Sequence, residues 1–207
     1  MLADRVGESF RERRMEFFLR LSAEISRPVT LLDVGGTCAF WRDRVPEGFQ
    51  LTILNVFDQD PVSNVRVVTG DACDLGSFSD KSFDIVFSNS VLGHVGGWDR
   101  QMKMAREIRR VGRKYFVQTP NQRFPLDWRT LVPFFHWLPP TTQAWFLQRC
   151  RIGRYERVSD PQEALHLASR VRNVTRKEIR LLFPEGAIVS ERALGLTKSF
   201  FVYSGLR

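Results

Sequence analysis

Residues 29–37 read VTLLDVGGT. The six residues from Val29 to Val34 are almost wholly apolar, and the pair Gly35-Gly36 stops the run at once. A short apolar run of this kind is typical of a strand that is buried on both faces of a parallel sheet. Glycines directly after such a strand let the backbone approach a ligand closely. The stretch therefore predicts an α/β protein with a binding turn after its first strand.

Similar apolar runs follow along the chain at the intervals of β-α-β units. They span residues 51–56, 65–68, 83–88 and 114–118. Between the last two lies a pattern of apolar residues at helical spacing: Trp98, Met102, Ala105 and Ile108. Strands that alternate with helices indicate a parallel α/β sheet.

Polar or small residues follow the ends of the first four runs. Asn55 comes about 20 residues after the glycines, where nucleotide-binding α/β domains place a side chain that bonds the ribose. The third run leads into Gly70-Asp71-Ala72, and the fourth leads into residues 88–94, SNSVLGH. Because the carboxyl ends of parallel strands meet at one edge of a sheet, we expect a ligand site there. The chain has neither a GxGxxG fingerprint nor the Gly-Lys-Ser/Thr of a phosphate loop.

Length and composition predict one globular domain. The chain has 207 residues, of which 43% are hydrophobic and 26% are charged. Its first 14 residues are charged and no run approaches about 18 apolar residues, so we expect a cytoplasmic protein without a transmembrane segment. Cys38, Cys73 and Cys150 are scattered, which predicts reduced thiols and no metal site. The net charge of +8 fits either an anionic partner or a general arginine bias.

The N-terminal segment predicts a helix. Apolar residues recur on one face of it: Phe10, Phe17, Leu21 and Ile25. Ser9 and Glu12 have the spacing of a capping box, and Pro28 marks the end. We expect a single domain, 1–207, made of four parts: this helix (1–25), a cofactor-binding core (29–120), a lid (121–174) and a C-terminal helix and hairpin (175–207).

The C-terminal part closes the sheet. Thr175 is the expected cap of a short helix that reaches Phe183. Two last apolar runs span residues 187–189 and 200–203, and residues 194–197 between them are typical of a hairpin turn.

Residues 124–148 are dense in Phe, Trp and Pro and interrupt the rhythm of strands and helices. Such an insertion is typical of a lid or a pocket wall. Its aromatic residues have two interpretations: packing within the lid, or contact with an apolar substrate or a membrane interface. The basic residues of 149–180 form either a solvated face or a clamp for a phosphate or carboxylate of a substrate.

Six segments occur in the order of one known family. They are LLDVGGT (31–37), GDACDL (70–75), FDIVFSNSVLGHV (83–95), YFVQTPN (115–121), FPLDW (124–128) and FFHWLPP (134–140). In these motifs the chain resembles the class I S-adenosylmethionine-dependent methyltransferases, specifically small bacterial members with a DVGG-type first motif. The resemblance runs from Leu31 to the C-terminus. It implies a Rossmann-like, doubly wound, mostly parallel seven-stranded sheet with a C-terminal antiparallel strand and a helical lid, and S-adenosylmethionine as the cofactor.

The resemblance also implies a set of cofactor-binding residues at the strand ends. The set is Asp33, Gly35, Gly36, Thr37, Asn55, Asp71, Ala72, Ser88 and Asn89. The first turn would hold the methionine portion, and Asn55 would bond the ribose. Asp71 would accept from the adenine amino group while the backbone of Ala72 donates to a ring nitrogen. Ser88 and Asn89 would face the transferred methyl group.

Three departures from the family pattern concern the chemistry more than the fold. Asn55 replaces a carboxylate, for which Asp58 is a possible substitute. Gly93 stands where relatives usually carry Glu before the histidine. Residues 127–129, Asp-Trp-Arg, replace a segment that often reads Glu-Pro-His. If that histidine is a base in relatives, this chain lacks it there.

Methyl transfer from a sulfonium is an in-line displacement that mainly requires alignment in a water-poor pocket. An oxygen nucleophile also benefits from a general base. The candidates are His94, His136, Asp127 and Tyr155, and for both histidines a structural role is the alternative. Asn121, Asp127 and Tyr155 are candidate substrate-binding residues, with a turn role as the alternative for Asn121.

Three function classes remain open from the sequence. The first is methyl transfer to a small-molecule acceptor that is apolar or anionic. The second is nucleic-acid methylation, which the positive charge allows, although no RNA-binding module and no Asn-Pro-Pro-Tyr motif is present. The third is a non-catalytic or repurposed member of the fold.

Overall fold

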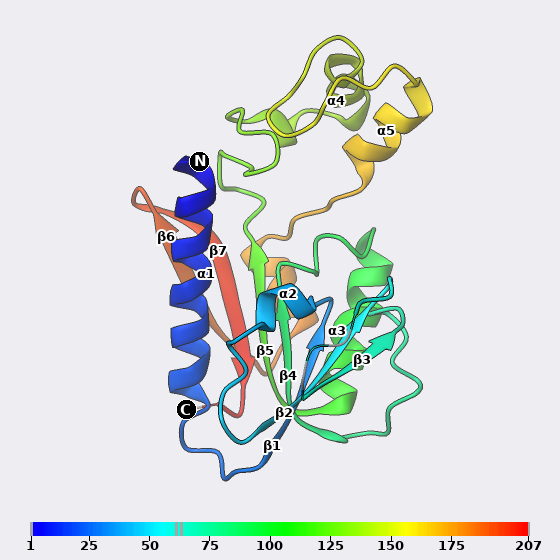
Figure 1. Ribbon diagram of the computed structural model, residues 1–207. Helices are drawn as coiled ribbons and strands as arrows, with labels where there is room; N and C mark the ends of the chain where they lie inside the picture. Colours follow the sequence, from blue (N-terminus) through cyan, green and yellow to red (C-terminus); the bar gives the residue numbers. More distant parts are fainter. Residues whose placement is uncertain (1, 61, 63, 207) are drawn as a thin grey trace.

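A computed structural model describes residues 2–60, 62 and 64–206, and these form one seven-stranded sheet flanked by helices (Figure 1). The strand order is β3-β2-β1-β4-β5-β7-β6. The strands are β1 (Val29–Val34), β2 (Phe49–Asn55), β3 (Val65–Thr69), β4 (Phe83–Asn89), β5 (Gly112–Pro120), β6 (Ala187–Ala193) and β7 (Leu196–Ser204). Strands β1 to β5 are parallel, and β7 runs antiparallel to its neighbours β5 and β6. The expected Rossmann-like fold class is confirmed.

The first apolar run lies at the centre of the sheet. β1 pairs with β2 on one side and β4 on the other, so that Leu31 faces Leu51 and Ile85 across the two ladders. All three of these side chains are buried. Because helices cover both faces of the sheet here, the central strands have no solvent side and need apolar residues at nearly every position.

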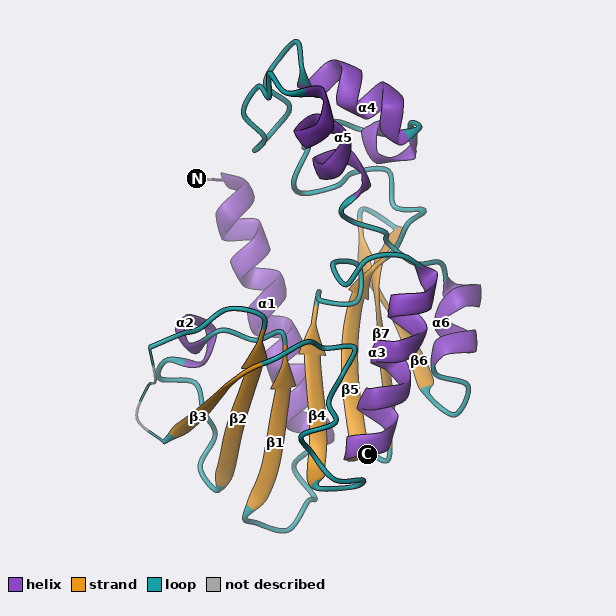
Figure 2. Cartoon of the chain, turned by 90° about the vertical axis from the view of Figure 1, so that its right-hand side faces the viewer, coloured by secondary structure: helices purple, strands orange, loops and turns teal. Residues whose placement is uncertain are grey.

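The helices divide between the two faces of the sheet and the lid (Figure 2). They are α1 (Leu2–Leu21), α2 (Cys38–Trp41), α3 (Trp98–Val111), the short 3₁₀ helix η1 (Phe135–Trp137), α4 (Pro140–Leu147), α5 (Pro161–Ser169) and α6 (Arg176–Leu182). One hydrophobic core joins α1 and α2 to the sheet through Phe18, Cys38 and Trp41. The other joins α3 and α6 to the opposite face, with Ile108 and Ile179 at its centre. No helix among residues 2–60, 62 and 64–206 is long and apolar enough to cross a membrane.

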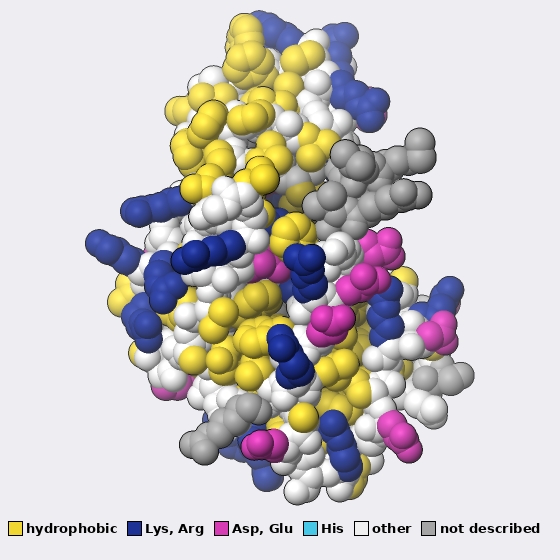
Figure 3. Space-filling model, turned by 90° about the vertical axis from the view of Figure 1, so that its left-hand side faces the viewer, with side chains coloured by type: hydrophobic (Ala, Val, Ile, Leu, Met, Phe, Trp, Pro, Cys, Tyr) yellow, Lys and Arg dark blue, Asp and Glu magenta, His cyan; other side chains and the backbone are white. Residues whose placement is uncertain are grey.

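Residues 121–174 form a lobe beyond the carboxyl edge of the sheet, at the top of Figure 1. This lobe, called the lid from here on, contains η1, α4 and α5. It has a small hydrophobic core of its own, whose buried members are Phe135, Ala144, Leu147, Ile152 and Ala164. Many of its other apolar side chains are exposed, and Figure 3 shows them gathered on one side of the molecule.

Two local expectations at the N-terminus were wrong. α1 begins at Leu2, so Ser9 lies inside the helix and caps nothing, and the helix ends at Leu21 rather than at Ile25. A capping-box spacing is a short pattern that also occurs within helices, where the backbone donors already have partners. The expected domain limits Met1 and Arg207 lie outside the described residues.

Other corrections concern faces and strand ends. Met102 is 40% exposed, and Gln101 takes the inward position on α3 because its amide donates to the carbonyl oxygens of Leu92 and Arg172. β6 and β7 are longer than their apolar runs, since pairing continues through polar residues up to the turn at Leu194-Gly195. The Thr175 cap is confirmed. In the reciprocal hydrogen bond, the carboxylate of Glu178 accepts from the backbone N–H of Thr175.

Candidate functional site

The turn after β1 holds its backbone in a form that depends on two glycines. Gly35 has φ of +80°, and a Cβ added there would lie 2.5 Å from the side chain of Val91. A Cβ added to Gly36 would collide with the carboxylate of Asp33. Only glycine fits both positions, because one needs a left-handed backbone and the other lies against a side chain. The turn therefore packs closely against Val91 and Asp33 at the carboxyl edge of the sheet.

Asp33 is a buried carboxylate beside this turn. It is 2% exposed, and one of its oxygens accepts a hydrogen bond of 2.6 Å from the indole Nε1 of Trp41. Burial raises the pKa of Asp33 to about 7, and the Trp41 bond opposes that rise. A positively charged group placed beside this carboxylate would favour its ionised form.

Asn55 braces the same turn from the end of β2. Its Nδ2 donates to the carbonyl oxygen of Gly36 at 2.7 Å, and its Oδ1 accepts from the backbone of Val56 at 2.8 Å. Val56 is 70% exposed and Phe57 is 51% exposed, so two apolar side chains flank the edge beyond Asn55. Asp58 is exposed and accepts from the Thr69 hydroxyl at 2.5 Å.

Asp71 follows β3 and is held in place by two partners. Its carboxylate accepts from the backbone of Cys73 at 2.9 Å and from the Arg100 guanidinium at 2.7 Å. Partial burial works to raise the pKa of Asp71, but these two bonds outweigh it and the pKa falls below its ordinary value. Asp71 is therefore an ionised acceptor at neutral pH. Ala72 beside it is buried.

The end of β4 separates two expected roles. The hydroxyl of Ser88 is fully buried and donates to the carbonyl oxygen of Val34 at 3.0 Å, so it ties β4 to β1 within the sheet. Asn89, one residue further, accepts from the Arg14 guanidinium at 3.3 Å and lines a cavity. Thr37 caps α2, since its hydroxyl accepts from the backbone of Phe40 at 3.3 Å.

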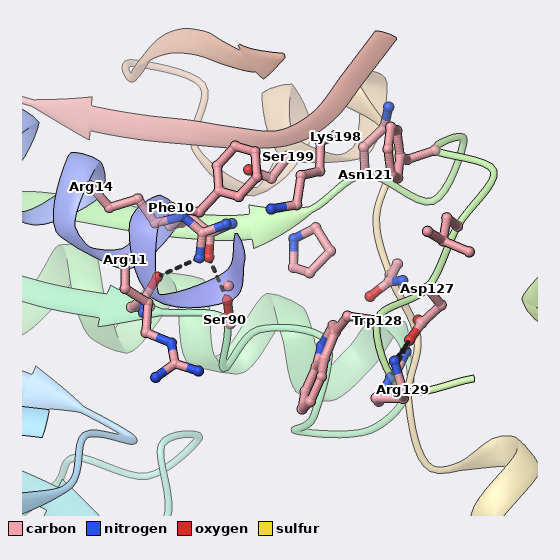
Figure 4. Close-up of a pocket in the computed structure, with 18 of the residues that line it drawn as sticks. Phe10, Arg11, Arg14, Ser90, Asn121, Asp127, Trp128, Arg129, Lys198 and Ser199 are labelled. Atoms are coloured by element: carbon pink, nitrogen blue, oxygen red, sulfur yellow. Dashed lines mark hydrogen bonds and ion pairs between the residues drawn. The ribbon is translucent and has the colours of Figure 1, made fainter. Parts of the chain in front are cut away.

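A cavity of about 260 Å³ opens beside this edge, between α1, the ends of β4 and β5, the start of β7 and the lid (Figure 4). The wall contains four residues proposed from the sequence, namely Asn89, His94, Asn121 and Asp127. It also contains residues that the sequence did not single out for this site: Gly7, Phe10, Arg11, Arg14, Ser90, Gly93, Gln118, Pro120, Phe124, Leu126, Trp128, Arg129, Arg154, Asn173, Lys198 and Ser199. They come from segments far apart in the chain, and their approach is a property of the fold.

Two ion pairs shape the wall of the cavity. Arg14 pairs with Glu191 at 2.7 Å, and both side chains are largely buried. Arg129 pairs with Asp127, with a hydrogen bond of 2.8 Å between Nε and Oδ1. Burial alone would raise the pKa of Asp127, but Arg129 holds that pKa below its ordinary value. Asp127 is consequently a positioning partner of Arg129 rather than a proton acceptor.

The candidate bases occupy different places. Partial burial, followed by the charges of Arg129 and Arg170, lowers the pKa of His94. His94 is therefore neutral at pH 7, as a general base must be. His136 lies in η1, where its Nε2 is 3.2 Å from the carbonyl oxygen of Gln122, and it is not among the residues that line the described cavity. Tyr155 lies behind Arg129, whose pKa it helps to raise.

Gly93 explains one departure from the family pattern. Its carbonyl oxygen accepts from the backbone of Arg172 at 2.9 Å, and a Cβ added to Gly93 would lie 3.2 Å from the Asn173 side chain. The return segment of the lid packs closely here, so a side chain at this position would require Asn173 or the backbone of Arg172 to shift by a few tenths of an ångström. The substitution therefore accompanies the way in which the lid rejoins the sheet.

Comparison with known proteins agrees with this geometry. Residues 48–115 match the family model described as a methyltransferase domain. The fold matches a Burkholderia thailandensis 1,6-didemethyltoxoflavin N1-methyltransferase with bound S-adenosylhomocysteine, at a TM-score of 0.55 and 15% identity over 98% of this chain and 85% of that one. Residues 48–115 thus match a methyltransferase domain, within a fold that is shared with S-adenosylmethionine-dependent methyltransferases.

Two further structures share this fold. A SAM-dependent methyltransferase from Aquifex aeolicus has a TM-score of 0.51 and 14% identity over 92% of this chain and 87% of that one. A complex from Haloferax volcanii, between the Trm112 methyltransferase activator and a methyltransferase, has a TM-score of 0.52 and 12% identity over 97% and 93%. No curated protein matches the sequence. At these identities the structures establish the fold of the chain, and any substrate must be inferred from its own site.

The residues at the strand ends fit the cofactor, S-adenosylmethionine. The buried Asp33 suits a neighbouring ammonium group, and the glycine turn keeps this edge free of side chains, since a Cβ at either position would clash with Val91 or Asp33. The exposed apolar pair Val56-Phe57 and the ionised Asp71 suit the flat, apolar face and the amino group of an adenine. When bound, S-adenosylmethionine supplies an electrophilic methyl group on a sulfonium sulfur.

Proposed function

We propose that this methyltransferase methylates a small-molecule acceptor bound in the cavity between α1, the ends of β4 and β5, and the lid. The observation that carries the proposal is the position of that cavity. Ser90, Gly93 and His94 line it directly after β4, and β4 is the strand next to the glycine turn of β1. An acceptor in the cavity therefore lies beside the edge at which the cofactor residues gather.

The cofactor residues have distinct roles in this proposal. The turn of Gly35 and Gly36, with Asp33 beneath it, holds the amino-acid end of the cofactor. Asn55 acts by bracing the turn, because both of its polar atoms are already engaged there. Asp71 binds the adenine amino group, and the backbone of Ala72 a ring nitrogen. Ser88 acts through the sheet, whereas Asn89 reaches the cavity.

The reaction needs alignment first and proton removal second. Fixing an acceptor in line with the methyl and the sulfur supplies about 7–11 kcal/mol toward the barrier. In this proposal the cavity wall and the lid provide that alignment. Asn121 is a fixed part of the wall, because its side chain donates a hydrogen bond of 2.7 Å to the carbonyl oxygen of Thr197. Where the methyl acceptor must lose a proton, the neutral imidazole of His94 takes up that proton. In this proposal His136 supports the lid, and Tyr155 supports Arg129.

Calorimetry with S-adenosylhomocysteine tests the cofactor half of the proposal. Asp71→Ala is expected to weaken binding by about tenfold, because it removes a charged hydrogen-bond acceptor. Asp80→Ala is the matched control, since Asp80 is an exposed carboxylate that also pairs with an arginine, Arg110. Equal affinity of the two variants would show that the adenine lies elsewhere.

Release of S-adenosylhomocysteine during turnover tests the acceptor half. We expect a small-molecule panel to yield a substrate whose kcat falls in His94→Gln while cofactor affinity is unchanged. A rate that is equal in this variant would leave alignment as the mechanism. Salt-sensitive binding and methylation of RNA or DNA, with no small-molecule turnover, would overturn the proposed acceptor class.

A further inference from the structure

Lys198 occupies an unusual place in the cavity wall. It lies near the start of β7, and its Nζ is 3.1 Å from the centre of the Phe10 ring on α1. The side chain is half-buried, and burial lowers the pKa of Lys198 to about 8, against the opposing charge of Glu191. Figure 4 shows Lys198 and Arg14 reaching into the same part of the cavity from β7 and α1. An ammonium group in this position is poorly solvated and would be stabilised by a bound anion.

The carboxylates near Lys198 are already engaged. Glu191 accepts two bonds from Arg14 and a third from the Ser199 hydroxyl. Asp127 is the only acidic residue among those that line the cavity in the described part of the chain, and it pairs with Arg129. Lys198 and Arg11 thus bring positive charge to a wall whose one carboxylate is neutralised. The excess charge has to be balanced by solvent ions or by the ligand.

Gln118 supplies an independent observation at the floor of the cavity. It is fully buried at the end of β5, and its Oε1 accepts from the Ser90 hydroxyl at 2.5 Å. Its Nε2 is buried without a hydrogen-bond partner among the described residues. A buried amide donor without a partner costs about 1–3 kcal/mol, and a ligand oxygen would remove that cost.

We propose that the acceptor carries an anionic oxygen group, a carboxylate or a phosphate, that binds between Lys198 and the amide of Gln118. The inference rests on the proposed function and names the substrate class of the same cavity. The wall also contains Phe10, Phe124 and Trp128, which offer apolar surface to the remainder of the acceptor. An anionic head held at β5 and β7 leaves the body of the acceptor to extend toward His94 and the end of β4.

Three phenyl probes, two anionic and one neutral, test this inference on the full chain saturated with S-adenosylhomocysteine. The probes are 4-hydroxybenzoate, its neutral methyl ester, and phenyl phosphate. Calorimetry or ligand-observed NMR at millimolar probe concentration is expected to show binding of the anions and at least about tenfold weaker binding of the ester. The two anions show whether a carboxylate or a phosphate is preferred.

Variants connect the preference to the proposed residues. Lys198→Met is expected to weaken binding of the preferred anion by about tenfold and to leave the ester unchanged, whereas Lys198→Arg retains the preference. Gln118→Leu is expected to cause a smaller loss, about threefold to tenfold. Lys103→Met, at an exposed position on α3, is the matched control.

The affinity for S-adenosylhomocysteine separates the two proposals. If the wild-type chain does not bind it, the proposed function fails. Where S-adenosylhomocysteine binds every variant, three results overturn only the anionic acceptor. The anions bind no better than the ester, the anions do not bind at all, or the anions bind Lys198→Met as well as the wild type. Unchanged affinity for S-adenosylhomocysteine also shows that each variant is folded.

Discussion

The sheet and the lid treat their aromatic residues in opposite ways. Phe18, Phe87 and Phe116 are at most 1% exposed, and the rings of Phe87 and Phe116 stack with their centres 5.6 Å apart. In the lid, Trp128 is 55% exposed and Phe134 is 54% exposed. Aromatic residues therefore have different structural roles in the two regions. In the sheet they supply the core, and in the lid many of them remain at the surface.

The difference follows from the size of the two cores. The sheet is covered on both faces, whereas the hydrophobic core of the lid has five buried side chains around two short helices. A region with few buried apolar contacts opens at lower free energy than the protein as a whole. We therefore expect the lid to open while the sheet and its cofactor edge remain folded, which is what entry of an acceptor beneath the lid requires.

The largest effect should come from the sheet core. Phe87→Ala is expected to lower the free energy of unfolding by about 3–5 kcal/mol, because it leaves a cavity among Phe18, Trp41 and Phe116. Phe134→Ala in the lid should cost at most about 1 kcal/mol, since its ring contacts Trp137 at the surface. Urea denaturation of both variants measures the contrast. Similar losses would show that the lid aromatics are buried in solution.

The buried carboxyl group of Asp33 should also have a large effect on the free energy of unfolding, and this effect depends on pH. The pKa of Asp33 is 3.8 without perturbation and about 7 when folded. Between these pH values the folded chain holds a proton that the unfolded chain has lost, so the contribution of Asp33 to stability falls as pH rises from about 4 to 7. Asp33→Asn should remove this fall, which is on the order of 4 kcal/mol.

Thermal or urea unfolding of the cofactor-free protein across this pH range tests the Asp33 prediction. Stability curves of the same slope for the wild type and Asp33→Asn would contradict it. A bound ammonium should lower the pKa of Asp33, so the wild type should also bind S-adenosylhomocysteine more tightly as pH rises through about 7.

The lid core should respond locally. Leu147→Ala is expected to cost about 2–3 kcal/mol, because Leu147 is 1% exposed at the centre of that core. Hydrogen exchange should accelerate in residues 135–168 and stay unchanged in β1 and β4. Leu165→Ala, at a 42% exposed position on α5, is the control. Faster exchange throughout the sheet would mean that the two regions unfold together.

The smallest effect should come from a charge at the lid surface. Arg151 and Glu156 form an ion pair of 3.3 Å, with side chains that are 66% and 75% exposed. Glu156→Gln should change the free energy of unfolding by less than about 0.5 kcal/mol, because water already solvates both groups. A larger loss in urea denaturation would place this pair in a more buried setting than the fold provides.

Much of the sheet could be predicted from local patterns. The limits of β1 were correct, and the other strands were correct to within a few residues, because an apolar run between glycines or polar residues is a local property of the chain. The Thr175 cap was correct for the same reason. The expected Ser9 cap of α1 was wrong, and Met102 was assigned to the wrong face of α3, because a capping pattern and an approximate helical spacing each have several solutions.

Only part of the site could be predicted from the sequence. Residues at the ends of β1 to β4 were expected to share one edge, and the fold brings them there. Lys198, Gln118 and Phe10 were missed, since each looks like an ordinary strand or helix residue. The one available signal was positional: a residue that begins an antiparallel strand beside β5 lies near the carboxyl end of β5.

The sequence by itself determined the α/β fold and the edge of the sheet that binds the cofactor, because strand burial and glycine turns depend on neighbours in the chain. Only the tertiary structure decided which distant side chains form the acceptor cavity, that Asn55 braces the turn, and that Lys198 lies against Phe10. The physical reason is that charge balance and unpaired hydrogen-bond donors are properties of a three-dimensional neighbourhood. They arise when α1, β5, β7 and the lid meet.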